Sequence, residues 1–134
     1  MKTYSIKALK KKLWEEFSLF IRMRDLHKGC ISCGKRFSGL CRSWQAGHYY
    51  TKGSSYAGIA YDEMNVNGQC AQCNLNEGEK QKYARGLIRR YGPNALEMIE
   101  LKRAMSSKNV WSAFHYQVLI DSYREKNKVT HGNQ

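Results

Sequence analysis

The spacing of apolar residues predicts that most of the chain is helical. Residues 5–25 carry apolar side chains at three- and four-residue intervals, and Ser5 is a suitable N-cap for this first helix. A second helix is predicted over residues 74–91, because the Gly-Pro pair at 92–93 follows it and such a pair commonly ends a helix. The stripe of the first helix consists of Ile6, Leu9, Leu13, Phe17, Phe20 and Ile21.

The C-terminal third predicts two further helices. One is expected over residues 93–105 and another over residues 110–126. The tail from Asn127 is expected to be frayed, as chain ends commonly are. The residues expected on the core side of the last helix are Trp111, Phe114, Val118 and Leu119.

The middle of the chain has a different pattern. Residues 28–43 hold three glycines and three cysteines, which indicates a tight knuckle-like turn. Residues 44–51 and 65–70 have the composition of short strands, and the segment between them is rich in Gly and Ser and reads as a loop. A small sheet among helices makes the expected fold class α+β.

Four cysteines indicate a metal site. Cys30, Cys33, Cys70 and Cys73 form two Cys-x2-Cys pairs, a spacing that presents four thiolates tetrahedrally to Zn²⁺. Iron also binds four sulfurs, but zinc is the commoner structural metal. Such a site has no open position for water, so we expect a structural zinc. Cys41 lies outside both pairs and is interpreted as a small buried apolar residue, or alternatively as a replacement ligand.

The chain is expected to form a single domain, residues 1–134, with three parts. Residues 1–27 form an N-terminal basic helix, residues 28–91 a zinc-bound core, and residues 92–134 C-terminal helices. No signal peptide or transmembrane run is visible, and the odd number of cysteines does not suit a disulfide framework. A reducing cytoplasm and no membrane partner are therefore expected.

Charge narrows the class of partner. The chain has a formal charge of +12, and its basic residues lie in two arms around a slightly acidic centre, residues 44–78. Clustered Lys and Arg favour nucleic acid over a membrane surface, for which only the basic first helix is suited. The candidate DNA contacts are Lys10, Lys11, Lys12, Arg85, Arg89 and Arg90.

The polar residues between and after the cysteines carry a resemblance. His48, Asn65 and Asn74 resemble the pattern of the HNH, or ββα-metal, nucleases, and "CNLNEG" is similar to the phage junction-resolving endonuclease VII. The segments "KLWEEFSLFIRMRD", "CISCGK", "AGHYY", "NVNGQCAQCN", "YGP" and "LKR…WS" resemble the NinG (Rap) recombination proteins of lambdoid phages. They extend over most of the chain, and together they are more specific than any one of them.

The resemblance implies a catalytic role for each polar residue. His48 is the general base, Asn65 fixes the loop that orients it, and Asn74 with Glu77 binds a catalytic Mg²⁺ or Mn²⁺. Many HNH nucleases carry Asp or His immediately before the base, whereas this chain has Gly47, which offers no ligand. Additional candidate ligands are Asp62 and Glu63.

The expected function is therefore a metal-dependent endonuclease that acts on Holliday junctions, D-loops or other branched DNA in phage recombination. The resemblance implies products with a 5′ phosphate and a 3′ hydroxyl, and a host-cell cytoplasmic location. Symmetric cutting of a four-way junction would suit a homodimer. Two alternatives remain: a zinc-stabilised DNA-binding module that does not cut, which Gly47 suggests, and an HNH nicking nuclease without structure preference.

Overall fold

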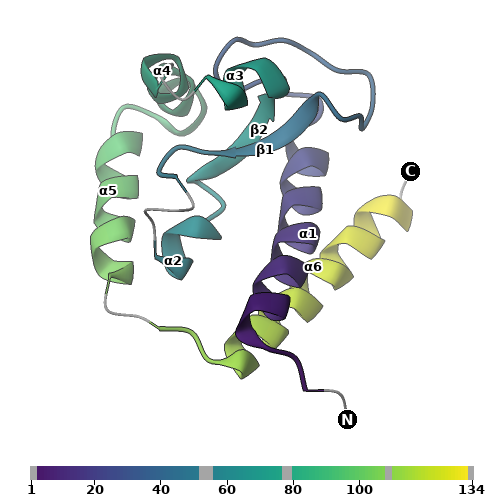
Figure 1. Cartoon of the computed structure of the whole chain (residues 1–134). Helices are drawn as coiled ribbons and strands as arrows, with labels where there is room; N and C mark the ends of the chain where they lie inside the picture. Colours follow the sequence, from purple (N-terminus) through teal and green to yellow (C-terminus); the bar gives the residue numbers. More distant parts are fainter. Residues whose placement is uncertain (1–2, 52–55, 77–79, 108–109, 133–134) are drawn as a thin grey trace.

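The computed structural model describes residues 3–51, 56–76, 80–107 and 110–132 and contains a two-stranded sheet among helices (Figure 1). The elements are α1 (Ile6–Asp25), β1 (Trp44–His48), α2 (Ala57–Ala60), β2 (Val66–Cys70), α3 (Ala71–Leu75), α4 (Lys80–Tyr91), α5 (Ala95–Ser106) and α6 (Ala113–Gly132). The predicted α+β class is confirmed.

The first helix forms as its pattern predicts. Ser5 caps it, because the side-chain oxygen accepts a hydrogen bond from the backbone N–H of Ala8 at 3.1 Å. Its buried residues include Leu9, Leu13 and Phe17, whose four-residue spacing keeps them on one face. This face packs on the sheet and on α6, which runs beside α1 in Figure 1.

The sheet is a single antiparallel pair. Trp44 lies opposite Cys70, and His48 lies opposite Val66. β1 ends at His48, three residues before the predicted end of the strand. Because side chains alternate along a strand, Gly47 and His48 face opposite sides of the sheet.

Three of the predicted elements differ from the structure. The helix predicted over residues 74–91 is two helices, α3 and α4, and residues 77–79 between them lie outside the described part. The segment interpreted as a loop contains the short helix α2. The prediction that the tail frays from Asn127 is wrong. Helix α6 continues to Gly132, and the Asn127 side chain donates to the Glu16 backbone carbonyl at 2.9 Å.

The predicted core face of the last helix is also partly wrong. Phe114 is 77% exposed and Val118 is 48% exposed, whereas the buried residues are Tyr116, Ile120 and Tyr123. Trp111 and Leu119 pack at the edge of the core, as predicted. The helical period was correct, but its phase is set by the position of α1, which the sequence pattern of α6 does not encode.

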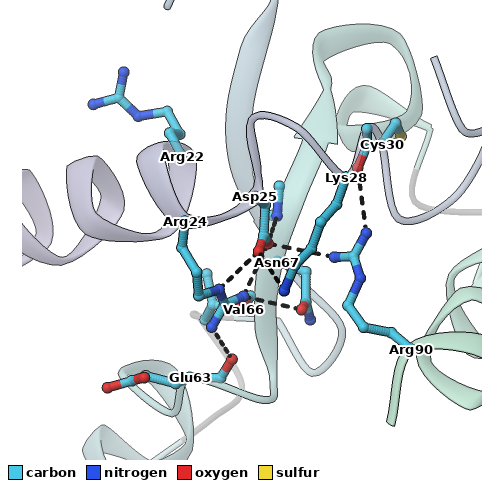
Figure 2. Close-up of polar contacts among 12 residues, drawn as sticks. Arg22, Arg24, Asp25, Lys28, Cys30, Glu63, Val66, Asn67 and Arg90 are labelled. Carbon is cyan, nitrogen blue, oxygen red and sulfur yellow. Dashed lines mark hydrogen bonds and ion pairs between the residues drawn. The ribbon is translucent and has the colours of Figure 1, made fainter. Parts of the chain in front are cut away.

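A buried carboxylate joins the end of α1 to β2 and α4 (Figure 2). Asp25 is fully buried and accepts hydrogen bonds from Arg24 Nε at 2.7 Å and from the Gly68 backbone N–H at 2.8 Å. Arg90 and Lys28 add ion pairs at 3.4 and 3.8 Å. Burial raises the pKa of Asp25, but Arg24, the Gly68 N–H and Arg90 together outweigh it and lower the pKa below its ordinary value.

Asp25→Asn is expected to lower the free energy of unfolding by about 3–5 kcal/mol, because Arg24 and Arg90 lose the charge that compensates their burial. The lowered pKa means that the unfolded chain binds more protons around pH 4, so the contribution of the carboxylate is complete at pH 7 and is lost only below about pH 4. Urea denaturation at pH 7 measures the effect. The exposed control, Asp121→Asn, should change stability by less than about 0.5 kcal/mol; equal losses in both variants would contradict the network.

Candidate metal centre and adjoining pocket

The four paired cysteines converge on one point. The ligand atoms of Cys30, Cys33, Cys70 and Cys73 all lie within 4.8 Å of one another, and the Cys33 and Cys70 sulfur atoms are 3.8 Å apart. A tetrahedron with Zn–S bonds of ~2.3 Å has sulfur atoms ~3.8 Å apart, so the arrangement fits a structural zinc. The predicted four-cysteine cluster is confirmed.

Local backbone geometry explains why the sulfur atoms meet. Cys30 precedes a tight turn, with Gly29 and Gly34 at φ of 82° and 79°, a left-handed conformation that glycine adopts without a steric penalty. Cys70 ends β2 and is the N-cap of α3, and its sulfur accepts the backbone N–H of Cys73 at 3.5 Å. The sulfur of Cys30 accepts two N–H groups in the same way, from Ser32 and Cys33.

The electrostatics of the cluster favour a bound cation. Burial raises the pKa of the Cys73 thiol, and hydrogen bonding and charge from the other three cysteines raise it further. Four thiolates are therefore unfavourable together without a positive charge among them, which a divalent metal supplies. Cys41 is exposed and lies outside the cluster, so the interpretation of it as a buried residue or a replacement ligand is wrong.

His48 lies at the end of β1 in a defined orientation. Its Nε2 is 2.8 Å from the Ala60 backbone carbonyl, and its ring stacks on Trp14 with centroids 5.0 Å apart. A carbonyl oxygen only accepts hydrogen bonds, so Nε2 carries the proton in the neutral ring and Nδ1 is the basic nitrogen.

Asn65 holds both ends of the segment from Tyr50 to α2, whose last residue, Ala60, supplies this carbonyl. The side chain is fully buried; its Nδ2 donates to the Ile59 carbonyl at 3.0 Å, one residue before Ala60. Its Oδ1 accepts the Tyr50 backbone N–H at 2.9 Å. The same amide therefore anchors the chain on both sides of the loop, close to the group that orients His48.

Gly47 is explained by close approach of two side-chain oxygens. A Cβ at this position would overlap with Gln69 Oε1 and lie 2.9 Å from Asn74 Oδ1, so any side chain would displace both. Each amide is held through its nitrogen: Asn74 Nδ2 donates to Gln45 Oε1, and Gln69 Nε2 donates to Ser32 Oγ, both at 2.9 Å. Two amide oxygens thus converge beside the residue that precedes His48.

The remaining candidate ligands are not gathered here. Asp62 forms an ion pair with Lys102 at 3.1 Å, and Glu63 accepts a hydrogen bond from Tyr123 at 2.7 Å. Both carboxylates are therefore engaged in holding helices together. Glu77 lies outside the described residues.

An open pocket of about 290 Å³ runs along the edge of β1. It extends from Trp14, the stacking partner of His48, to Asn74, and Ala46 and Gln45 from opposite faces of the strand both line it. The pocket therefore connects the surroundings of His48 with those of Asn74, which strand alternation alone would separate. Its other lining residues are Ser18, Arg22, Cys41, Arg42 and Trp44.

The predicted DNA contacts fall into two groups. Lys10, Lys11, Arg85 and Arg89 are exposed, and Lys12 is half-buried over the Tyr4 ring. Arg90 is instead held by Asp25 and by the Gly29 carbonyl at 3.4 Å, with only 14% of its side chain exposed.

Sequence reasoning found Asn74 but missed most of the other residues that line the pocket. Trp14, Ser18 and Arg22 recur at four-residue intervals on α1, which places them on one helix face. That spacing was a usable signal, but the stronger apolar stripe of α1 obscured it. Nothing in the local sequence signalled Gln69, because its approach to Gly47 depends on strand register.

The fold and the cysteine cluster define a small α+β protein whose four paired cysteines are positioned to bind a metal ion. A family model described as Bacteriophage Lambda NinG protein matches residues 2–132. The chain therefore belongs to the NinG family, and this part of the predicted resemblance is confirmed. No solved structure matches the chain.

Named relatives come from several phages. The chain is 32% identical over 119 residues to protein ninG of Escherichia phage 933W and of Salmonella phage P22, and 31% identical to that of Escherichia phage lambda. Each alignment covers 88% of this chain and 55–56% of the relative, so the chain spans about half the length of these curated relatives.

In the described part of the chain, no helix is both long and apolar enough to cross a membrane.

Proposed function

We propose that this chain is a metal-dependent DNA endonuclease of the HNH type, with His48 as the general base. The observation that carries the proposal is the contact of His48 Nε2 with the carbonyl of Ala60, the last residue of α2, a helix that Asn65 anchors through Ile59. This contact fixes the ring and leaves Nδ1 as its basic nitrogen, which supports a general base because a base needs a fixed orientation and a neutral ring.

Two amide oxygens offer ligands for a divalent cation at Gly47, the residue that precedes this base. Asn74 Oδ1 and Gln69 Oε1 both lie within 2.9 Å of the point above Gly47, and Mg²⁺ and Mn²⁺ prefer oxygen ligands. Gln69 thus offers an oxygen where Gly47 offers none. The bound cation supplies Lewis-acid stabilisation of negative charge on phosphate oxygens. Glu77 remains a further candidate ligand from the sequence resemblance.

In the proposed reaction, water attacks the phosphorus atom and His48 accepts the proton of that water. His48 Nδ1 takes a proton from water as the water oxygen forms a bond to phosphorus and the bond from phosphorus to the 3′ oxygen breaks. The products are a 5′ phosphate and a 3′ hydroxyl once the leaving oxygen gains a proton from solvent. The structural zinc takes no part, since four cysteine ligands leave no open coordination position.

The formal charge of +12 supports nucleic acid as the substrate. Lys10, Lys11, Arg85 and Arg89 are exposed for contacts to backbone phosphates, which carry little base specificity. Because such contacts do not read the base sequence, the protein would select its DNA substrate by shape. We propose a four-way or other branched DNA substrate in phage recombination, in the cytoplasm of the host cell. A homodimer would provide two active sites for symmetric cutting.

Cleavage of a labelled four-way junction by zinc-loaded protein is expected to require added Mg²⁺ or Mn²⁺, with products that carry a 5′ phosphate. An excess of unlabelled junction should suppress the reaction more strongly than linear duplex of equal length. Gel analysis of four-way, forked and linear substrates measures both effects. Binding without cleavage of any substrate would instead support a DNA-binding module, and equal competition by linear duplex would support a nicking nuclease without structure preference.

A further inference from the structure

Arg22 is a half-buried cation that no acidic side chain neutralises among the described residues. Its Nε donates to the Ser18 backbone carbonyl at 3.2 Å, and no ion pair engages its guanidinium. In Figure 2 it points away from Asp25, whereas Arg24, two residues later on α1, points into that network. Burial lowers the pKa of Arg22 below its ordinary value, so its environment in the free protein disfavours the charge.

The guanidinium borders the pocket beside β1. Arg42, from the turn before β1, lines the same pocket, and Asn74 lies on its wall. The pocket volume of about 290 Å³ is roughly ten times the ~30 Å³ that one water molecule occupies in the liquid. Two cations therefore face an open, water-accessible space, and none of the described residues that line it is a carboxylate.

We propose that Arg22, together with Arg42, binds a phosphodiester group of a nucleic-acid backbone in this pocket, next to Asn74. A guanidinium presents several N–H donors in a planar fork that matches two phosphate oxygens. An anion would also compensate the burial of Arg22, which the protein itself does not. The inference deepens the proposed function, because it places the bound backbone between Trp14, the partner of His48, and the Asn74 oxygen.

The occupant is a polymer backbone rather than a small anionic metabolite. The pocket is open along the strand edge, whereas small-molecule sites enclose most of the ligand surface. Exposed Lys10 and Lys11 lie on the same helix as Arg22, nearer its N-terminus, and supply further positive charge for a continuing backbone.

The test compares Arg22→Gln with Arg22→Lys and a matched control, Arg124→Gln. Arg124 lies on α6 and pairs with Glu16 at 3.4 Å, on a different face of α1 from the pocket. Zinc-loaded proteins are titrated against a fluorescent DNA duplex, without added Mg²⁺ or Mn²⁺, at several salt concentrations. Thermal melting of each variant is measured in the same buffer.

Arg22→Gln is expected to weaken binding about tenfold, which equals about 1.4 kcal/mol, because one charge-assisted contact to a phosphate is lost. The slope of log K against log salt should become shallower by about 0.9, the loss of one phosphate contact. Its melting temperature should be unchanged or higher, because an uncompensated half-buried charge is removed. Arg22→Lys should retain the salt slope and most of the affinity, and Arg124→Gln should bind within twofold of wild type.

The binding experiment separates this inference from the proposed nuclease. A wild-type chain that binds but does not cleave, with Arg22→Gln weakened as described, supports the phosphate site and rejects the nuclease. A wild-type chain that cleaves, with Arg22→Gln binding equally well, overturns the phosphate site alone. A lower melting temperature that accounts for the weaker binding of Arg22→Gln also overturns it, as does absence of DNA binding by the wild type at low salt.

Discussion

His48→Ala is expected to reduce the rate of junction cleavage by ~10²–10⁴ while junction affinity stays within a few fold of wild type. The size of the rate reduction follows from the loss of a general base. Binding persists because the exposed Lys and Arg residues are unchanged. The zinc ligands are also unchanged, so the variant should contain the same metal. Single-turnover cleavage with saturating protein, combined with gel-shift titration, measures the two quantities separately.

A structural role for His48 predicts a different outcome. The substitution removes the stacking on Trp14 and the hydrogen bond to the Ala60 carbonyl, so a purely structural histidine would lower stability, binding and cleavage together. His115→Ala is the matched control, because His115 is exposed and stacks on Trp111 with centroids 4.3 Å apart, away from the β1 pocket. Cleavage by His48→Ala at the wild-type rate would reject the HNH assignment.

Cys73→Ser is expected to release the metal and to unfold the core around β1, β2 and α3. A structural zinc contributes on the order of 10 kcal/mol or more, which is comparable to the whole stability of a domain of this size. Trp44 packs against Cys30 and Cys70 in the same cluster, so loss of the metal also disturbs this buried aromatic contact. Elemental analysis should give one zinc per wild-type chain, and tryptophan fluorescence should report the unfolding.

Cys41→Ser provides the control for that experiment. Cys41 is exposed and outside the four-cysteine cluster, so this variant should keep one zinc and its wild-type melting temperature. Metal loss from Cys41→Ser would show that this thiol takes part in coordination. A folded Cys73→Ser variant with full stability and no bound metal would reject the structural role of the zinc.

The local parts of the fold could be predicted from the sequence, because short-range periodicity is sufficient for them. The first helix and its Ser5 cap were predicted because the apolar spacing and the capping residue lie within a few residues of each other. The face of α6 that is buried could not be predicted in this way. The burial of Ile120 and the exposure of Phe114 depend on how α6 crosses α1. That crossing joins segments about a hundred residues apart, as the hydrogen bond from Asn127 to Glu16 illustrates.

The roles of individual cations were decided only by tertiary contacts. Arg22 and Arg90 are alike by composition, and the sequence suggested Arg90 as a phosphate contact. The fold instead brings Arg90 to Asp25, 65 residues earlier in the chain, whereas Arg22 is directed into the pocket. A buried carboxylate attracts the cations that chain crossings bring near it, so a linear pattern does not show which arginine pairs with a buried acid and which lines a pocket.

By itself, the sequence determined the four-cysteine cluster, the α+β class and the resemblance to the NinG family. The cysteine cluster could be predicted from residue spacing alone, because two Cys-x2-Cys pairs are the usual ligand pattern of a four-cysteine zinc site. Only the tertiary structure shows that a Cβ at residue 47 would meet the side-chain oxygens of Gln69 and Asn74. The antiparallel pairing of β1 with β2 brings Gln69 near Gly47, and α3, which follows β2, brings Asn74 there, so a Cβ at residue 47 would require both side chains to move.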